Sequence, residues 1–224
     1  MLISQINYSQ KPKLKLDKES FLLGTLSDYM GRIVISNQKE KIDEYDNPMA
    51  ETITSLFKAD YDDYRTEIKE YPAYHSNKMI VYSAKLSKKI NANFTFEKYA
   101  LTHPNKDTVY YGKLKENLFQ TELQKISFIV GLYSQSGVEN KTRYCIRLSN
   151  SVRKFTEAEK VLKELHCQNV DVAIEKNIPT QFILYFKPSA ALKKYLKEYM
   201  FLRKAIQKEL ENRFQLSSKH SAKK

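Results

Sequence analysis

The chain has 224 residues, of which 42% are hydrophobic, and its 38 lysines and arginines against 26 acidic residues give a formal net charge of +12. This composition suits one large domain or two small ones, and the positive charge is typical of a nucleic-acid-binding protein. No run of about 18 apolar residues is present, so no membrane partner is expected, and the two cysteines and four histidines lack the spacing of a zinc site.

Residues 1–16 are predicted to form a polar N-terminal arm with lysines at alternate positions, either a solvated tail or a strand along a phosphate backbone. Its first residues lack the charged start and long apolar centre of a secretory signal. We therefore expect a cytoplasmic protein or one inside an organelle, a mitochondrion or a chloroplast.

Residues 17–101 are predicted to form a first half that begins with Asp17 as the N-cap of a helix. Hydrophobic spacing, prolines and turn residues define its further elements. The predicted order is a helix at 20–30, a strand at 32–38, a charged loop at 39–47, a helix at 48–59, strands at 64–71 and 78–83, and a helix at 86–99. Residues 102–117, rich in turn formers and weakly patterned, are predicted to link the halves.

Residues 118–214 repeat this order and are predicted to form a second half, followed by a disordered basic tail at 215–224. The predicted elements are a helix at 118–136, a strand at 141–150, a helix at 156–167, strands at 170–174 and 182–187, and a last helix from 188. Two halves of similar order indicate an internal pseudo-repeat.

The strand at 141–150 alternates between apolar and basic residues. Tyr144 and Ile146 point one way, whereas Lys141, Arg143 and Arg147 point the other. Such a strand packs one face on helices and presents the other to phosphates or to a DNA groove, or it is an ordinary half-exposed strand. We assign nucleic-acid binding to these three cations, and to Arg32 and Lys78 of the first half.

Four of the five glycines fall in two similar helices, Gly24 and Gly31 in the first half and Gly131 and Gly137 in the second. Glycine costs roughly 1 kcal/mol relative to alanine inside a helix, so a mid-helix glycine indicates that two backbones approach closely. We predict that these glycines pack the two helices together.

This pair resembles the two signature helices of the LAGLIDADG family, the homing endonucleases and intron maturases. The resemblance implies an α+β fold with two pseudo-symmetric αβαββα-type halves, each with a curved antiparallel sheet, packed through two glycine-containing helices. It further implies a monomer that binds a long duplex DNA site on a basic β-saddle.

In that family, each signature helix carries an acidic residue just before its last glycine, and the two acids hold metal ions. Here Ser136 takes the second acidic position, and Asp28 is the candidate for the first as catalytic residue and metal ligand. The implied cofactor is Mg²⁺, which carboxylates hold and serine does not. We therefore expect cleavage to be weak or absent.

Two alternatives to a homing endonuclease or its degenerate descendant stay open. A maturase-like or structural RNA-binding protein would share the fold and would not need the acids. A replication initiator of two winged-helix domains would also show helices, strand pairs and a basic surface. The paired glycines favour the homing endonuclease and the RNA-binding protein over the replication initiator.

Overall fold

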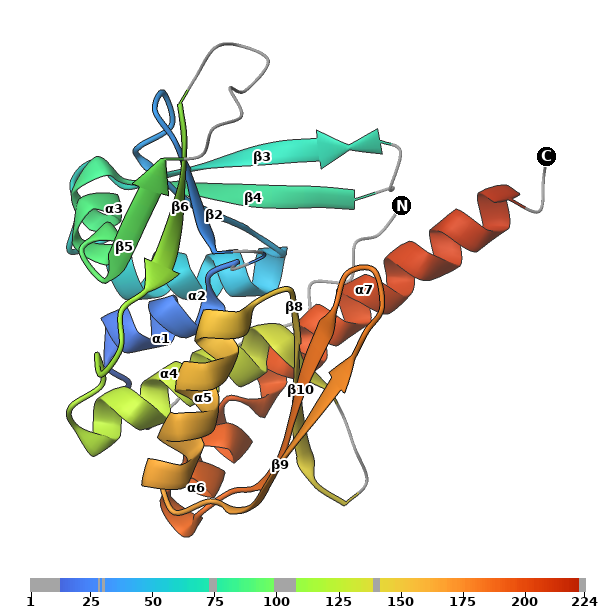
Figure 1. The fold of residues 1–224 in the computed structure, drawn as a ribbon. Helices are drawn as coiled ribbons and strands as arrows, with labels where there is room; N and C mark the ends of the chain where they lie inside the picture. Colours follow the sequence, from blue (N-terminus) through green and yellow to red (C-terminus); the bar gives the residue numbers. More distant parts are fainter. Residues whose placement is uncertain are drawn as a thin grey trace.

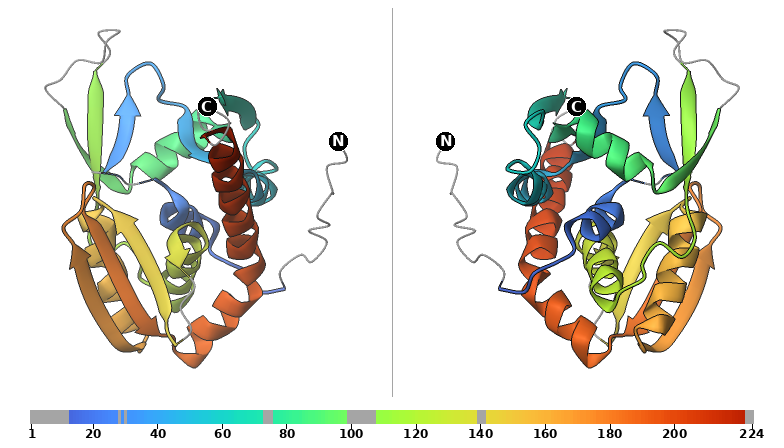
Figure 2. Two further views of the ribbon diagram at one scale, coloured as in Figure 1. Left: turned by 90° about the vertical axis from the view of Figure 1, so that its right-hand side faces the viewer. Right: turned by 90° about the vertical axis from the view of Figure 1, so that its left-hand side faces the viewer.

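The computed structural model describes residues 13–27, 29, 31–72, 76–98, 108–138 and 142–221, with the side chains of 214 and 216–221 left aside. Two helices, α1 (Lys18–Thr25) and α4 (Glu122–Ser136), lie side by side at the centre of the molecule (Figure 2). Antiparallel sheets and further helices surround them, so the predicted α+β class is confirmed.

Local capping fixes where the two central helices begin. The Asp17 carboxylate accepts a hydrogen bond from the Ser20 backbone N–H at 2.9 Å, which confirms the predicted N-cap of α1. Thr121 and Gln124 form a capping box at the start of α4. The far end of α1 differs from the prediction, because Leu26 adopts extended backbone angles and the helix stops at Thr25 instead of reaching Met30.

The first half contains two three-stranded sheets, ordered β2-β4-β3 and β1-β6-β5 (Figure 1). Its remaining elements are β1 (Arg32–Ile35), β2 (Lys41–Tyr45), α2 (Asn47–Phe57), β3 (Arg65–Tyr71), β4 (Ser76–Tyr82), α3 (Ala84–Asn91), β5 (Phe94–Lys98) and β6 (Val109–Leu114).

Three of the sequence predictions for this half are wrong. The charged loop contains strand β2, which pairs with β4. The last helix stops at Asn91, and Phe94 and Phe96 belong to β5. The proposed linker contains β6, which lies between β1 and β5 and so belongs to the first half. The hairpin of β5 and β6 pairs with β1 through β6. This pairing joins distant segments and has no local signal in the sequence.

The second half has one four-stranded sheet, ordered β7-β8-β10-β9. Its remaining elements are β7 (Gly137–Val138), β8 (Tyr144–Ser149), α5 (Val152–Glu164), β9 (Gln168–Glu175), β10 (Gln181–Lys187), α6 (Ala190–Glu198) and α7 (Met200–Ser221). The order β8-β10-β9 repeats β2-β4-β3 of the first half, so the pseudo-repeat is visible in the sheets. Among the described residues, no helix is long and apolar enough to cross a membrane.

Two of the four glycines account for the contact between the central helices. A Cβ atom added to Gly24 would lie 2.7 Å from the Leu132 nitrogen and closer still to the Phe128 carbonyl oxygen. One added to Gly131 would lie 3.0 Å from the Phe21 carbonyl carbon and closer still to its oxygen. The backbones of α1 and α4 therefore touch where the side chains are missing.

The other two glycines do not lie between the helices. Gly31 has a φ of +110°, and a Cβ atom there would lie 2.8 Å from the Gly112 carbonyl oxygen of β6. Gly137 ends α4, and a Cβ atom there would lie 2.9 Å from the Tyr133 ring. The packing role predicted for these two positions is corrected to one in chain reversal and strand entry.

Candidate nucleic-acid interface and helix-end site

The sheet of the second half turns one face to helices and leaves the other exposed. Tyr144 and Phe182 contact aromatic side chains of α4 and α5, with ring centroids 5.3 Å and 5.1 Å apart. Arg147, on the opposite face of β8, is exposed, and Arg143 just before the strand lies with its guanidinium 4.8 Å from the centroid of the Tyr185 ring. The alternation predicted for this strand is therefore present.

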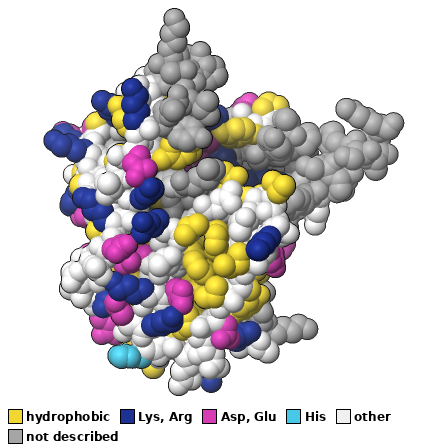
Figure 3. Space-filling view, viewed as in Figure 1, with side chains coloured by type: hydrophobic (Ala, Val, Ile, Leu, Met, Phe, Trp, Pro, Cys, Tyr) yellow, Lys and Arg dark blue, Asp and Glu magenta, His cyan; other side chains and the backbone are white. Residues whose placement is uncertain are grey.

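Each of these arginines is paired with a carboxylate of β9. Arg143 pairs with Asp171, and Arg147 donates to the Glu175 carboxylate at 3.1 Å. All four side chains are at least one-third exposed. Figure 3 shows the same intermixing of basic and acidic side chains on the face that it presents. The basic surface therefore carries its own counter-charges.

The sheet β2-β4-β3 of the first half has a matching exposed face. The Arg65 guanidinium lies 4.3 Å from the centroid of the Tyr82 ring. This contact is of the same kind as that of Arg143 with Tyr185. Glu44 on β2 binds Lys41 at 2.5 Å and Lys69 at 3.2 Å. It also accepts a hydrogen bond from the Tyr71 hydroxyl. Both exposed sheet faces thus combine cations, tyrosines and acids.

Glu44 gives the fold a testable dependence on pH. Burial alone would raise the pKa of this carboxyl, but its bonds with Lys41, Tyr71 and Lys69 outweigh burial and lower the pKa to about 2. The stabilisation is therefore complete above the ordinary pKa of 4.5 and is lost as the pH falls towards 2. We expect Glu44→Gln to remove at most about 3 kcal/mol of unfolding free energy at pH 7 and little at pH 2.

Urea unfolding of wild type and Glu44→Gln between pH 7 and pH 2 measures this dependence. Glu67→Gln is the matched control, because Glu67 lies on the neighbouring strand β3, is 54% exposed, and has a long ion pair with Arg65 at 3.5 Å. A stability difference that is the same at every pH would contradict the assigned role of Glu44.

The other predicted contact residues have different surroundings. Lys141 lies outside the described residues. Lys78 is partly exposed and pairs with Asp46 at 3.3 Å. Arg32 is 3% exposed, and its guanidinium donates to Asn91 Oδ1 at 2.5 Å and to the Ile42 carbonyl at 2.9 Å. Arg32 is therefore a buried structural cation, which corrects its assignment as a surface contact.

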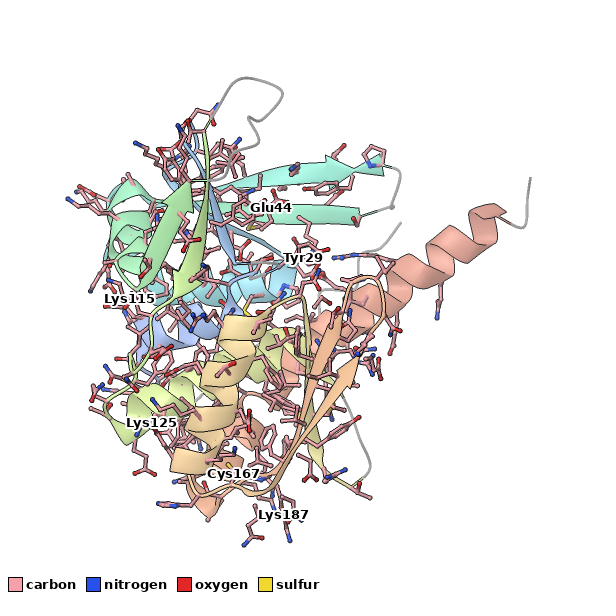
Figure 4. The ribbon with its side chains drawn as sticks, viewed as in Figure 1. Tyr29, Glu44, Lys115, Lys125, Cys167 and Lys187 are labelled. Carbon is pink, nitrogen blue, oxygen red and sulfur yellow. The ribbon has the colours of Figure 1, made fainter. Side chains whose placement is uncertain are left out.

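The C-terminal ends of α1 and α4 meet beside the N-terminus of α5. Lys154 of α5 is 2% exposed, and its ammonium donates to the carbonyl oxygens of Leu26 at 2.5 Å and Gly24 at 3.3 Å. This is a cation placed on the negative end of α1. Asp28 lies outside the described residues, whereas Tyr29 lies between the sheet that carries Glu44 and the upper end of β8 (Figure 4).

Comparison with solved structures identifies the fold. The chain is similar to mesophilic variants of the homing endonuclease I-DmoI, with a TM-score of 0.52 at 14% identity over 81% of this chain and 94% of that one. It is also similar to an I-DmoI variant bound to its target DNA with manganese, with a TM-score of 0.54 at 16% identity over 80% and 90%. The chain has the fold of a LAGLIDADG homing endonuclease. No family model and no curated sequence matches it.

Ser136 is the last residue of α4. Ser136 lines the cavity at the helix ends together with Lys154, which carries a positive charge. The described part of the chain holds no group of three histidine, cysteine or acidic residues that could bind a metal ion. The described residues at this site therefore do not fit a divalent ion.

One more carboxylate lies near the end of α1. Asp43 of β2 accepts hydrogen bonds from the backbone N–H groups of Ser27 and Glu44. Burial raises the pKa of this carboxyl, although the bonds from the Ser27 and Glu44 N–H groups and the charges of Arg32 and Lys154 oppose the rise. One of its oxygens thus joins the segment just after α1 to β2, and the other bonds within β2.

Sequence reasoning missed Lys154, Glu44 and the acids of β9. Asp171 and Glu175 stand four residues apart, which puts both on one face of a strand, so their alternation could have revealed them. Lys154 had no such signal, because its partners lie 128 and 130 residues away in the sequence.

Proposed function

We propose that this protein binds a long duplex DNA site on the exposed faces of its two sheets and acts as a monomer, as a homing endonuclease or a degenerate descendant of one. The observation that carries the proposal is the repeated arrangement of an arginine over a tyrosine, Arg65 on Tyr82 in one half and Arg143 on Tyr185 in the other. The fold and the net charge of +12 support it.

Cleavage is proposed to be weak or lost. Proteins usually hold Mg²⁺ through one or two carboxylates, and an ion bound here would supply stabilisation of the attacking and leaving oxygens of phosphodiester hydrolysis. Ser136 supplies no negative charge, and Lys154 opposes a second cation beside it. Asp28 stays the predicted ligand of the first half.

The test is the double variant Arg143→Ala with Arg147→Ala. Each arginine that contacts a phosphate adds about one unit to the slope of log affinity against log salt, so we expect the slope to fall by about two. Fluorescence anisotropy of a labelled duplex measures both affinity and slope. The control is Lys160→Ala with Lys163→Ala, which removes the same charge from the helix α5.

Removing the carboxylates of β9 should have the opposite effect on duplex binding. Asp171→Asn with Glu175→Gln removes the intramolecular competitors of the arginines, so duplex binding should tighten. If the double arginine variant of the sheet and the double lysine variant of α5 weaken duplex binding equally, only net charge matters. That result would contradict binding on a β-saddle. Tighter binding to structured RNA than to duplex would replace DNA as the partner.

Incubation of the same duplex with Mg²⁺ tests the loss of cleavage. We expect binding without double-strand breaks. Cleavage that disappears in Asp28→Asn would establish an active endonuclease despite Ser136.

A further inference from the structure

The hairpin of β5 and β6 has no counterpart among the described strands of the second half. The helix before it does have one, since α3 follows β4 just as α6 follows β10. Both helices begin after an N-cap serine, Ser83 or Ser189, whose hydroxyl accepts from a backbone N–H. In the first half, the added sheet β1-β6-β5 lies beside this helix (Figure 1). The space between α3 and the added sheet is therefore particular to this half.

A cavity of about 460 Å³ lies between α3 and the added sheet, and we call it the hairpin pocket. The sheet contributes three lining residues and α3 contributes three, at helical spacings of four and three. They are Val34, Phe96 and Tyr110 of the sheet and Ala84, Lys88 and Asn91 of α3. Its size and its mainly apolar surface are typical of a site for a small organic molecule.

The fifth glycine of the chain, Gly112, shapes the sheet side of the hairpin pocket. Phe96 lies opposite Gly112 in the register of β5 and β6. A Cβ atom added to Gly112 would lie 2.6 Å from the Phe96 ring. The missing side chain therefore lets this ring lie against the backbone of β6. Together with Tyr110, it gives the pocket an aromatic wall.

The charged residues among those that line the hairpin pocket are both lysines. They are Lys88 of α3 and Lys39, which lies just before β2. Both are exposed, and neither forms an ion pair within the described part of the chain. The other two lysines of α3 are each paired with an acid. An apolar surface with two uncompensated cations complements a molecule that has an apolar body and one anionic end.

We propose that the hairpin pocket binds a small amphipathic carboxylate. Its apolar chain or ring lies against Phe96 and Tyr110, and its carboxylate is held by Lys88 and Lys39. Apolar contact supplies most of the affinity, and the lysines select the anion over a neutral or cationic analogue. The inference goes beyond the proposed function and is independent of it, because no lining residue belongs to the sheet faces assigned to DNA.

Calorimetric titration of the full chain with octanoate, below its micelle concentration, tests the hairpin pocket. We expect saturable binding of octanoate, about ten-fold weaker binding of octanol, and none of octylamine. Octanol and octylamine have the same chain, so they separate the charge from the apolar contact. Absence of octanoate binding, or equal binding of the three compounds, would overturn the inference.

A larger side chain at Ala84 should block the hairpin pocket. Ala84 is the exposed first residue of α3, so Ala84→Phe fills the pocket without disturbing the core and should abolish octanoate binding. Ala190→Phe is the matched control, because Ala190 is the exposed first residue of the corresponding helix α6. Thermal unfolding verifies that both variants are folded. Equal octanoate binding by the two folded variants would contradict the proposed location.

The role of the charge is tested at Lys88. Lys88→Gln should weaken octanoate binding about three-fold and leave octanol binding unchanged, as expected for an exposed ion pair. Lys194→Gln is the matched control, since Lys194 is exposed and takes the same position in α6, four residues after the first. If both variants weaken octanoate binding equally, only net charge attracts the carboxylate, and the assignment to this pocket fails.

Discussion

Replacing Gly131 with leucine is expected to reduce the free energy of unfolding by about 3 kcal/mol or more. The added side chain would collide with the carbonyl group of Phe21, which is part of the α1 backbone and cannot rotate away as a side chain could. The two central helices would have to separate, and the core on both sides of them would open. Gly24→Leu should have a similar effect, because its collision is with the backbone of α4.

Thermal and urea unfolding monitored by circular dichroism measure the loss. Ser55→Leu is the matched control, because it adds a leucine to the exposed side of α2 and should change stability by less than about 0.5 kcal/mol. If Gly131→Leu unfolds with the wild-type midpoint, the close packing of α1 on α4 is refuted.

Arg32→Met is expected to cost about 3 kcal/mol of unfolding free energy without weakening nucleic-acid binding by the folded protein. The buried guanidinium donates to Asn91 Oδ1 and to the Ile42 carbonyl. Its charge also opposes the rise that burial causes in the pKa of Asp43. Removing it leaves these acceptors without donors in the interior. Arg32→Lys should recover part of the stability, because lysine keeps the charge but lacks the planar fork.

Two measurements together decide the role of Arg32. Urea unfolding gives the loss of stability, and duplex anisotropy at a temperature where the variant is folded gives the affinity. A stable Arg32→Met variant with weakened duplex binding would restore the original assignment of Arg32 as a contact residue and would contradict its structural role.

Much of the fold follows from local signals. The Asp17 N-cap, the alternation of β8 and the mid-helix glycines at 24 and 131 are patterns within a few residues of one another, and each has the predicted structure. The strands that were not predicted also have physical reasons for being missed. The strand β2 is short and charged, and β6 looks like a linker because it has weak apolar periodicity and contains Gly112.

The candidate site could be predicted only in outline. Arg143 and Arg147 were found because strand alternation alone places them on the exposed face. Their ion pairs with β9 residues, 28 positions further along the chain, depend on strand register. Arg32 looked like an exposed cation, since nothing nearby in the sequence indicates that Asn91 and β2 bury it.

The sequence by itself determined the net charge of +12, the two glycine-containing helices and the serine that precedes the last glycine of the second one. These are properties of composition and short-range spacing, which do not depend on how distant segments meet. Only the tertiary structure decided that Lys154 lies on the end of α1 and that Arg32 is buried. The physical reason is that burial and charge pairing are set by contacts between segments that are distant in the sequence, 59 residues apart for Arg32 and Asn91 and 128 for Lys154 and Leu26, and these form only when the chain folds.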